Sequence, residues 1–205
     1  MADTIFPFDS KITYDQRKKA LMQEPRLIWL TGLSGAGKTT LALRLEHYFF
    51  LKGFKVFMLD GDNVRNGLCS DLSFTEDDRK ENLRRVAEVS RLMLDAGLMI
   101  ICAFISPNGE DRLAIKKIVG DERFVEVYVN CSVEVCEERD VKGLYAKARK
   151  GIIPNFTGVS APYDAPILPD IEVRTAEETV EQSVNKIIKI VEPLSTYKDS
   201  ISSAV

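Results

Sequence analysis

Histidine is almost absent from this sequence of 205 residues, because His47 is the only one. The four cysteines, Cys69, Cys102, Cys131 and Cys136, include no pair with C-x-x-C spacing. A zinc site of the usual Cys/His pattern is therefore excluded. We expect reduced thiols in a cytoplasmic protein. We expect His47 to be a surface or packing residue on a helix rather than a catalytic group.

Excess positive charge and long apolar runs are also missing. The net charge is −3, which offers no electrostatic basis for binding nucleic acid or an anionic membrane. No apolar run approaches the length of a membrane span, so we expect no membrane helix. Residues 1–4 lack the basic and apolar regions of a signal peptide, and we expect none. An anionic ligand must then be held by a local cluster of positive groups.

The composition that remains is typical of a globular protein, with 45% hydrophobic and 29% charged residues. A chain of this length can bury one sizeable core. We expect a leader at residues 1–25, one domain at residues 26–192 and a tail at residues 193–205. The sequence contains no internal repeat and no low-complexity segment.

The dominant motif follows an apolar run at residues 27–31. Residues 32–39 fit G-x-x-x-x-G-K-[ST], and the helical pattern that follows is the context of a phosphate-binding loop. In such a loop, backbone N–H groups surround phosphate oxygens at a helix N-terminus. Lys38 is expected to reach the β- and γ-phosphates of ATP, and the Thr39 hydroxyl to hold Mg²⁺. The ATP-binding residues predicted here are Gly32, Leu33, Ser34, Gly35, Ala36, Gly37, Lys38, Thr39 and Thr40.

Strand-like and helix-like segments alternate along the chain. Strands are predicted at 27–31, 55–59, 98–104, 124–129 and 171–174. Helices are predicted at 14–22, 38–52, 75–96, 110–119, 132–139 and 175–191, and helical character resumes after residue 139 through residue 150. Capping boxes are predicted to begin at Thr75 and Thr175. The alternation predicts an α/β fold of three layers, the P-loop NTPase fold, with a mostly parallel five-stranded sheet between helices. Residues 151–169 are irregular, and a functional lid is expected at about residues 140–166.

Polar residues follow strands whose carboxyl ends should meet at one edge of the sheet. Asp60 and Asp62 follow the second strand, and we choose Asp62 as the base that takes a proton from a hydroxyl. A simple Asp-rich turn is the alternative for this pair. One face of the long helix carries Arg79, Asn82, Arg85 and Glu88. This face is either a salt-bridged surface or a part of the site.

A basic cluster precedes the irregular stretch, at Arg139, Lys142, Lys147, Arg149 and Lys150. It is either a solvated charge run or a lid that closes over phosphate charge and excludes water. Phe156, within the stretch, offers a ring that could stack on a base. These patterns indicate a small P-loop kinase for a small molecule. A GTPase-like switch lacks its N-K-x-D motif here, and a motor lacks its acidic residue, because the third strand ends in I-S-P at 105–107.

Several motifs together resemble the adenylylsulfate kinase (APS kinase) family. They are G-L-S-G-A-G-K-T at 32–39, D-G-D-N-V-R at 60–65, E-D-D-R-K-E-N at 76–82, F-I-S-P at 104–107, R-D-V-K-G-L-Y at 139–145, F-T-G at 156–158 and A-P-Y-D-A-P at 161–166. The resemblance extends from about residue 10 to about residue 190. It implies that ATP phosphorylates the 3′-hydroxyl of adenosine 5′-phosphosulfate (APS) to give PAPS and ADP. It also implies a homodimer.

The resemblance assigns residues to the acceptor nucleotide. The set carried over is Asp60, Asp62, Arg65, Phe74, Arg79, Asn82, Ile105, Ser106, Lys142, Gly143, Leu144 and Phe156. Within this set, Phe74 and Phe156 would sandwich the adenine. Arg65, Arg79 and Lys142 would neutralise the phosphosulfate.

Two further residues, and Ser106 again, receive roles in the same way. Arg139 and Arg149 would lie near ATP. Ser106 matches a serine that the family is often described as phosphorylating transiently, which places it with Lys38 and Asp62 in the catalytic set. Capping the next turn is the other role open to Ser106, since direct in-line transfer needs no serine intermediate.

The sequence departs from the family pattern at the substrate rim. Asn66 and Cys69 stand where His and Asn are usual, and Asn108 and Gly109 stand where Tyr and Arg are usual. These changes bear on affinity and leave the chemical groups in place. Two other hypotheses remain open, namely a kinase for another small molecule, such as a nucleoside or a sugar acid, and a nucleotide-binding regulatory subunit without turnover.

Overall fold

A computed structural model describes residues 10–198 of the chain. Its centre is a sheet of five strands in the order β2-β3-β1-β4-β5, and all four pairings are parallel. The strands are β1 (Leu27–Thr31), β2 (Val56–Asp60), β3 (Met99–Ala103), β4 (Phe124–Asn130) and β5 (Ile171–Arg174). The predicted bounds of β1 and β5 are confirmed, and those of the other strands differ by one residue at one or both ends. The predicted α/β fold with a parallel sheet is confirmed.

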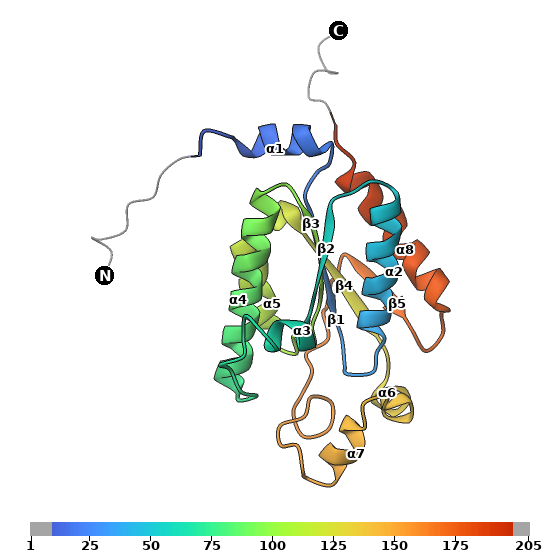
Figure 1. The fold of residues 1–205 in the computed structure, drawn as a ribbon. Helices are drawn as coiled ribbons and strands as arrows, with labels where there is room; N and C mark the ends of the chain where they lie inside the picture. The colour runs from blue at the N-terminus through green and yellow to red at the C-terminus, as the bar shows by residue number, and fades with distance from the viewer. Residues whose placement is uncertain (1–9, 199–205) are drawn as a thin grey trace, which may run out of the picture.

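Helices cover both faces of this sheet. In Figure 1, α4 and α5 lie on one face, and α2 and α8 lie on the other. The helices are α1 (Tyr14–Leu21), α2 (Lys38–Leu51), α3 (Gly61–Arg65), α4 (Glu76–Asp95), α5 (Gly109–Val119), the 3-10 turn η2 (Asp121–Arg123), α6 (Val133–Arg139), α7 (Leu144–Arg149) and α8 (Val180–Ser195). Within residues 10–198, no helix is both long enough and apolar enough to cross a bilayer.

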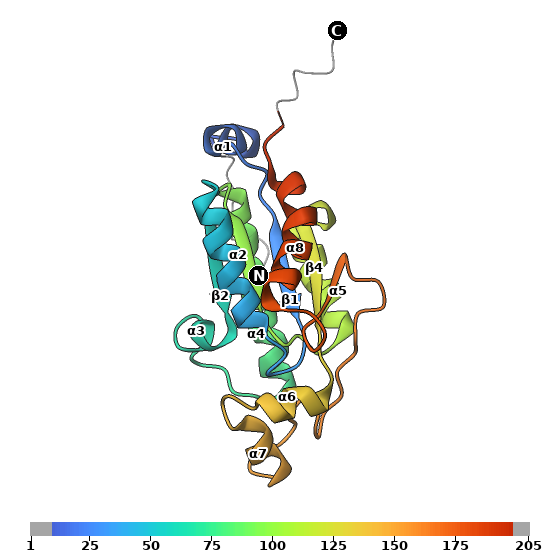
Figure 2. The same ribbon diagram turned by 90° about the vertical axis from the view of Figure 1, so that its right-hand side faces the viewer.

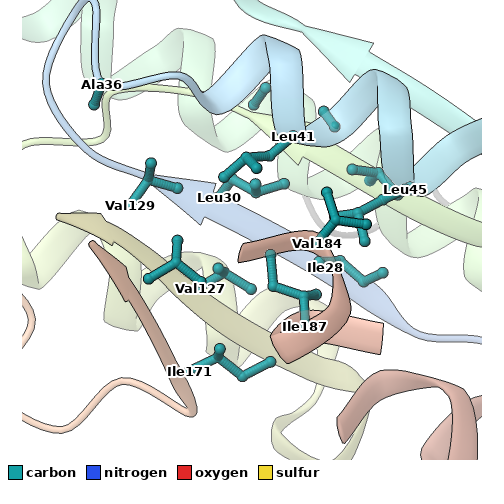
Figure 3. Packing of buried hydrophobic residues seen from close by; sticks show 14 of the residues in the cluster. Ile28, Leu30, Ala36, Leu41, Leu45, Val127, Val129, Ile171, Val184 and Ile187 are labelled. Atoms are coloured by element: carbon teal, nitrogen blue, oxygen red, sulfur yellow. The ribbon is translucent and has the colours of Figure 1, made fainter. Parts of the chain in front are cut away.

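Strand β1 supplies both cores, because all five of its residues are buried. Ile28 and Leu30 point toward α2 and α8, while Leu27 and Trp29 pack in the core under α4 and α5. Figure 3 shows the first core, where Leu41 of α2 and other apolar side chains of α2, β4, β5 and α8 meet β1. A continuous apolar strand is expected at the centre of a parallel sheet that is covered on both faces.

Two predicted capping boxes differ from the structure. Helix α8 begins at Val180, with Thr179 and Gln182 forming the capping box, so the box predicted at Thr175 was wrong. The Thr175 hydroxyl instead donates to Ala36 O at 2.8 Å, which uses it in a tertiary contact. At α4, Thr75 caps the helix as predicted, but the side chain of Asp78 bonds to Ser73 and does not complete a box.

The two ends of the sheet have different roles. At the amino end of β2 and β3, the buried Gln23 donates to Gly97 O at 2.8 Å and accepts from Lys55 N at 2.7 Å, which ties the first segment to the domain. At the carboxyl end, Figures 1 and 2 place α3, α6 and α7 beside the loop that follows β1. Ligands of open α/β sheets bind at this end.

Candidate active site

The loop at 32–37 joins β1 to α2 and approaches neighbouring backbone closely. A Cβ on Gly32 would lie 2.5 Å from Val129 O, and one on Gly35 would lie 2.9 Å from Cys136 O. Gly35 also has a φ of +78°, which other residues rarely adopt. Glycine is therefore required at both positions, and the loop can hold its N–H groups open to a phosphate.

Lys38 begins α2 and lies under this loop. Its Nζ donates to Gly32 O at 2.9 Å and to Leu33 O at 2.7 Å. Burial disfavours the ammonium ion and lowers the pKa of Lys38 from 10.5 to about 8. An anionic phosphate beside Nζ would reverse this effect, so the site is electrostatically prepared for a phosphate group.

The two aspartates after β2 have different environments. Asp60 Oδ2 accepts from the Thr39 hydroxyl at 2.9 Å, and Asp60 Oδ1 accepts from Asp62 N at 3.0 Å, which caps α3. The carboxylate of Asp62 is exposed and forms an ion pair with Lys142, which lies in the segment predicted to be a lid. Asp60 therefore organises the edge of the sheet, and Asp62 keeps an accessible carboxylate beside the Lys142 ammonium.

Arg65 and Arg79 form a pair of guanidinium groups with neutral partners. Arg65 donates to Ser73 O at 2.9 Å and lies over the ring of Phe74, 4.3 Å from its centre. Arg79 donates to Phe74 O at 3.0 Å and to Asn155 O at 2.9 Å. Burial, followed by the charge of Arg65, lowers the pKa of Arg79. Within residues 10–198 neither arginine forms an ion pair with a carboxylate, so the pair is suited to an anion.

The predicted face of α4 is divided between the two uses that we considered. Asn82 is buried and its Oδ1 has no hydrogen-bond partner, so this oxygen is free to accept from a ligand. Arg85 instead pairs with Asp71 and Glu81, and Glu88 pairs with Arg91. In the first half of the face Asn82 therefore keeps a free acceptor, as the predicted site requires, and the second half is a salt-bridged surface.

The basic residues of the lid region are also divided. Arg139 donates to Thr175 O at 2.7 Å and to Gly35 O at 3.4 Å, so it lies at the phosphate loop. Arg149 is instead bonded to Glu137 of α6 through two nitrogens, at 2.8 and 3.0 Å. Gly143, with a φ of +65°, precedes Leu144 at the start of α7. The structure thus joins Arg139 to the predicted ATP site and engages Arg149 elsewhere.

The two predicted stacking rings lie in different surroundings. Phe74 is 66% exposed at the start of α4, whereas Phe156 is 8% exposed. The ring of Phe156 packs edge-on against Tyr145, with ring centres 5.0 Å apart. Phe74 therefore has a face open to a base, and Phe156 is held in place by its neighbour.

Ser106 lies in the turn after β3 and is 2% exposed. Its Oγ accepts from Trp29 Nε1 at 3.0 Å and donates to the Thr31 hydroxyl at 2.8 Å. The alternative role of Ser106 as a cap is not observed, because Asn108 caps α5. Thr31 also donates to Ile105 O at 2.8 Å, so the end of β1 fixes this turn.

Two residues at the phosphate loop were absent from the predicted site. Tyr145 donates its hydroxyl to Ser34 O at 2.9 Å, and Thr175 bonds to Ala36 O as described above. Tyr145 stands inside the motif at 139–145, which was a usable signal. Thr175 carries no local signal, because its partner is distant in the sequence.

Comparisons with known proteins agree with this geometry. A family model described as adenylylsulphate kinase matches residues 24–174. The adenylyl-sulfate kinase of Staphylococcus epidermidis is 51% identical over 181 residues, which are 88% of this chain and 91% of that protein. The solved APS kinase CysC of Mycobacterium tuberculosis, in complex with AMPPNP and APS, is 40% identical with a TM-score of 0.79, and the match covers 82% of this chain and 98% of that one.

A more distant match differs in length. The hexameric APS kinase from Thiobacillus denitrificans is 27% identical with a TM-score of 0.64. The match covers 84% of this chain and 29% of that one. The family model alone spans most of the present chain, and the phosphate loop, the aspartate edge and the arginine pair lie within it. The chain belongs to the adenylylsulphate kinase family.

Proposed function

We propose that this protein transfers the γ-phosphoryl group of ATP to the 3′-hydroxyl of APS, giving PAPS and ADP. The pair of Arg65 and Arg79 is the observation that carries this proposal. Both guanidinium groups are satisfied only by neutral oxygens, and Arg65 stands on the same short helix as Asp62. An acceptor with a strong anionic group, such as a phosphosulfate, would compensate this charge and bring its hydroxyl toward the base.

On the donor side, the loop at 32–40 cradles the phosphates of ATP. Its backbone N–H groups and Lys38 neutralise charge that spreads over the phosphoryl oxygens during transfer. Arg139 is placed to act on the same nucleotide, because it already bonds to Gly35 O. We include Arg149 in the ATP site on the resemblance alone, and it would have to leave Glu137.

The oxygen atoms at the edge of the sheet fit Mg²⁺. The Thr39 hydroxyl and the Asp60 carboxylate are hard oxygen ligands and already lie together. Residues 10–198 contain no group of three or more His, Cys, Asp or Glu side chains that could enclose a metal. This suits a cation that binds through one or two protein oxygens, phosphates and water. When bound, Mg²⁺ would neutralise phosphate charge, and Thr39 and Asp60 would hold it.

Asp62 acts on the acceptor. The 3′-oxygen of APS forms a bond to the γ-phosphorus while the bond from that phosphorus to the β,γ-bridging oxygen breaks, and ADP leaves. Asp62 accepts the proton of the attacking hydroxyl. Lys142, now paired with Asp62, is a cation that can turn to the phosphosulfate as the acceptor enters. The lid then excludes water from the reacting groups.

The remaining acceptor residues position the nucleotide. Phe74 and Phe156 would stack on the adenine, and the free Oδ1 of Asn82 would accept a hydrogen bond from the nucleotide. The segments at 105–106 and 143–144 would line the same half of the site. We propose that Ser106 acts by fixing its turn and forms no phosphorylated intermediate, since its hydroxyl is already bonded on both sides.

The test of the proposal is ADP release. Purified protein with ATP and Mg²⁺ should release ADP in the presence of APS, and release should fall to background when APS is omitted. Gluconate and adenosine, offered in place of APS, test the other small-molecule kinases that we considered. ADP release that stays at the background rate when APS is present would contradict the proposal. ADP release that is faster with gluconate or adenosine than with APS would also contradict it. Tight binding of APS and ATP without ADP would indicate a regulatory subunit.

We also propose a homodimer with a cytoplasmic location and a kinase domain at residues 26–192. The family resemblance supports the dimer, and the four free cysteines suit a reducing compartment. Light scattering coupled to size-exclusion chromatography would measure the oligomeric state. A monomer across micromolar concentrations would contradict the dimer.

A further inference from the structure

The lid is attached to the domain at two ends that contact different halves of the site. Its amino-terminal end, at Arg139, bonds to the phosphate loop and to Thr175. Its carboxyl-terminal end bonds to the turn after β3, because Asp164 N donates to Pro107 O at 2.8 Å. The hydroxyl of Tyr163 lies 3.0 Å from that of Thr31. The second attachment is therefore on the acceptor side.

Arg112 of α5 links the carboxyl-terminal end of the lid to the turn after β3. Its Nη1 donates to Ser106 O at 2.8 Å, and its Nη2 donates to Asp164 O at 2.6 Å. Its Nε lies 2.9 Å from Glu126 Oε1 of β4, and the side chains of Arg112 and Glu126 are 7% and 17% exposed. One planar guanidinium group thus connects the acceptor turn, the lid and the sheet.

The position of this attachment is transmitted to the acceptor site through a short, internally bonded turn. Gly158 N donates to Ala161 O at 2.8 Å, and Ala161 N donates to Phe156 O at 3.1 Å. Just before this turn, Asn155 O accepts from Arg79. The turn is therefore compact, and it carries the stacking ring and a contact to the anion-binding arginine. A shift at Asp164 would move both of these groups.

A buried ion pair is a weak argument for stability by itself. Two charges removed from water can be replaced by apolar side chains of similar volume with little loss, whereas removal of one partner leaves an uncompensated charge. This asymmetry allows stability and positioning to be separated by experiment. Arg112 also donates hydrogen bonds to Ser106 O and Asp164 O, and an apolar side chain could not replace these bonds.

We propose that Arg112 is a positioning residue for the acceptor, which holds the carboxyl-terminal end of the lid against the turn at 105–107. The inference rests on the proposed function, because it takes APS as the acceptor. Arg112 acts through Phe156 and Arg79 and does not contact the phosphate loop. Its loss should therefore weaken the use of APS and leave the use of ATP nearly unchanged.

The test uses Arg112→Met, the double variant Arg112→Met/Glu126→Leu, and Arg112→Lys. Arg112→Met leaves Glu126 unpaired, and its melting temperature should fall. The double variant should recover most of the lost melting temperature, because no charge is left unpaired. It should nevertheless show a kcat/KM for APS reduced by about 10- to 100-fold, since a misplacement of about 1 Å can cost about 100-fold. The KM for ATP should stay within about twofold of its normal value, because the donor loop is untouched.

Arg112→Lys keeps the charge and loses the planar fork, so it should fold and show a smaller defect of the same kind. Arg123→Met is the matched control. Arg123 also pairs with a carboxylate, Asp95, and donates to a carbonyl, Val119 O, but at the far end of α5. It should change stability without changing kcat/KM for APS.

Tryptic cleavage after Lys147 and Lys150 provides a readout that does not depend on activity. The double variant should be cut in the lid faster than the normal protein, with the rest of the domain equally resistant. A stable double variant with normal kcat/KM for APS and normal lid cleavage would overturn the inference. If the normal protein itself releases no ADP with APS, the proposed function fails, and the cleavage rates alone still decide whether Arg112 holds the lid.

Discussion

The donor half and the acceptor half of the proposed site are built in different ways. The proposed donor half is mainly one continuous segment, the loop at 32–37 and the first turn of α2, in which Lys38 bonds back to Gly32 O and Leu33 O. The acceptor half is assembled from α3, α4, the turn after β3 and the lid. Its principal charges, on Arg65 and Arg79, have only neutral partners.

This difference indicates where each half obtains its specificity. A loop with its own internal bonds holds any phosphate group of the correct shape, so it serves many P-loop proteins. An uncompensated arginine pair is stable only when an anion or water shares its charge, so under the proposed function it would select the acceptor by charge. Changes to the donor half should therefore affect ATP, and changes to the acceptor half should affect APS.

The largest effect is expected at the point where the halves meet. Asp62→Asn keeps the size of the side chain and removes the proton acceptor. Turnover should fall by about 100- to 10,000-fold, because a positioned base contributes about that factor. Assays of ADP release over time measure the loss of turnover. Fluorescence titration should show nearly normal ATP affinity. Normal turnover in Asp62→Asn would remove Asp62 from the role of base, and Asp121→Asn, on the exposed η2, is the control.

The next effect tests the acceptor half alone. Arg79→Met removes one of the two uncompensated charges, and kcat/KM for APS should fall by about 10- to 100-fold, the value of a hydrogen bond to a charged group. The KM for ATP should change little. Arg84→Met on the same helix removes an exposed arginine that is paired with Glu81, and should leave both constants unchanged. Equal losses for ATP and APS in Arg79→Met would contradict the separation of the halves.

A pH effect tests the donor half. Without nucleotide, burial holds the pKa of Lys38 at about 8, and bound phosphate should raise it. The protonated form binds phosphate, so ATP affinity should be full below pH 8 and fall by about tenfold for each pH unit above it. Calorimetry at pH 8.5 in two buffers of different ionisation enthalpy should reveal proton uptake. Lys38→Met should bind ATP weakly with no such uptake, and equal uptake in both proteins would contradict the assignment to Lys38.

Much of the fold could be predicted because its signals are local. The apolar run of β1, the glycine loop and α2 are adjacent in the sequence, so their order specifies a strand, a phosphate loop and a helix. The capping prediction at Thr175 was wrong because the pattern S/T-x-x-E/Q occurs twice within a few residues. Local reasoning could not show that Thr179 caps the helix while Thr175 serves the loop.

The acceptor half was harder to predict, because its contacts join distant segments. Arg112 and Asp164 are 52 residues apart, and Arg79 and Asn155 are 76 residues apart. No periodicity or local motif links such pairs. Arg65 and Arg79 were selected through the family resemblance, and the structure adds the physical reason, namely the absence of acidic partners within the described chain.

The smallest effect concerns the contact between the halves. Tyr145→Phe removes the hydrogen bond to Ser34 O and keeps the ring that packs on Phe156. The free energy of unfolding should fall by about 1 kcal/mol, the net value of one hydrogen bond. Denaturant unfolding with normal m-values measures this change. A loss of turnover comparable with that of Asp62→Asn would show that Tyr145 does more than join the lid to the loop.

The central claim is that a phosphoryl group passes from a nucleotide in the donor half to the 3′-hydroxyl of an acceptor held by the arginine pair. Phosphorus NMR of a reaction with ATP, Mg²⁺ and APS tests it most directly. We predict a new phosphomonoester resonance coupled to the 3′-proton of the APS ribose, growing in step with ADP and growing at least about 100-fold more slowly when Asp62→Asn replaces the normal protein. Hydrolysis of ATP to inorganic phosphate, with APS unchanged, would contradict the account.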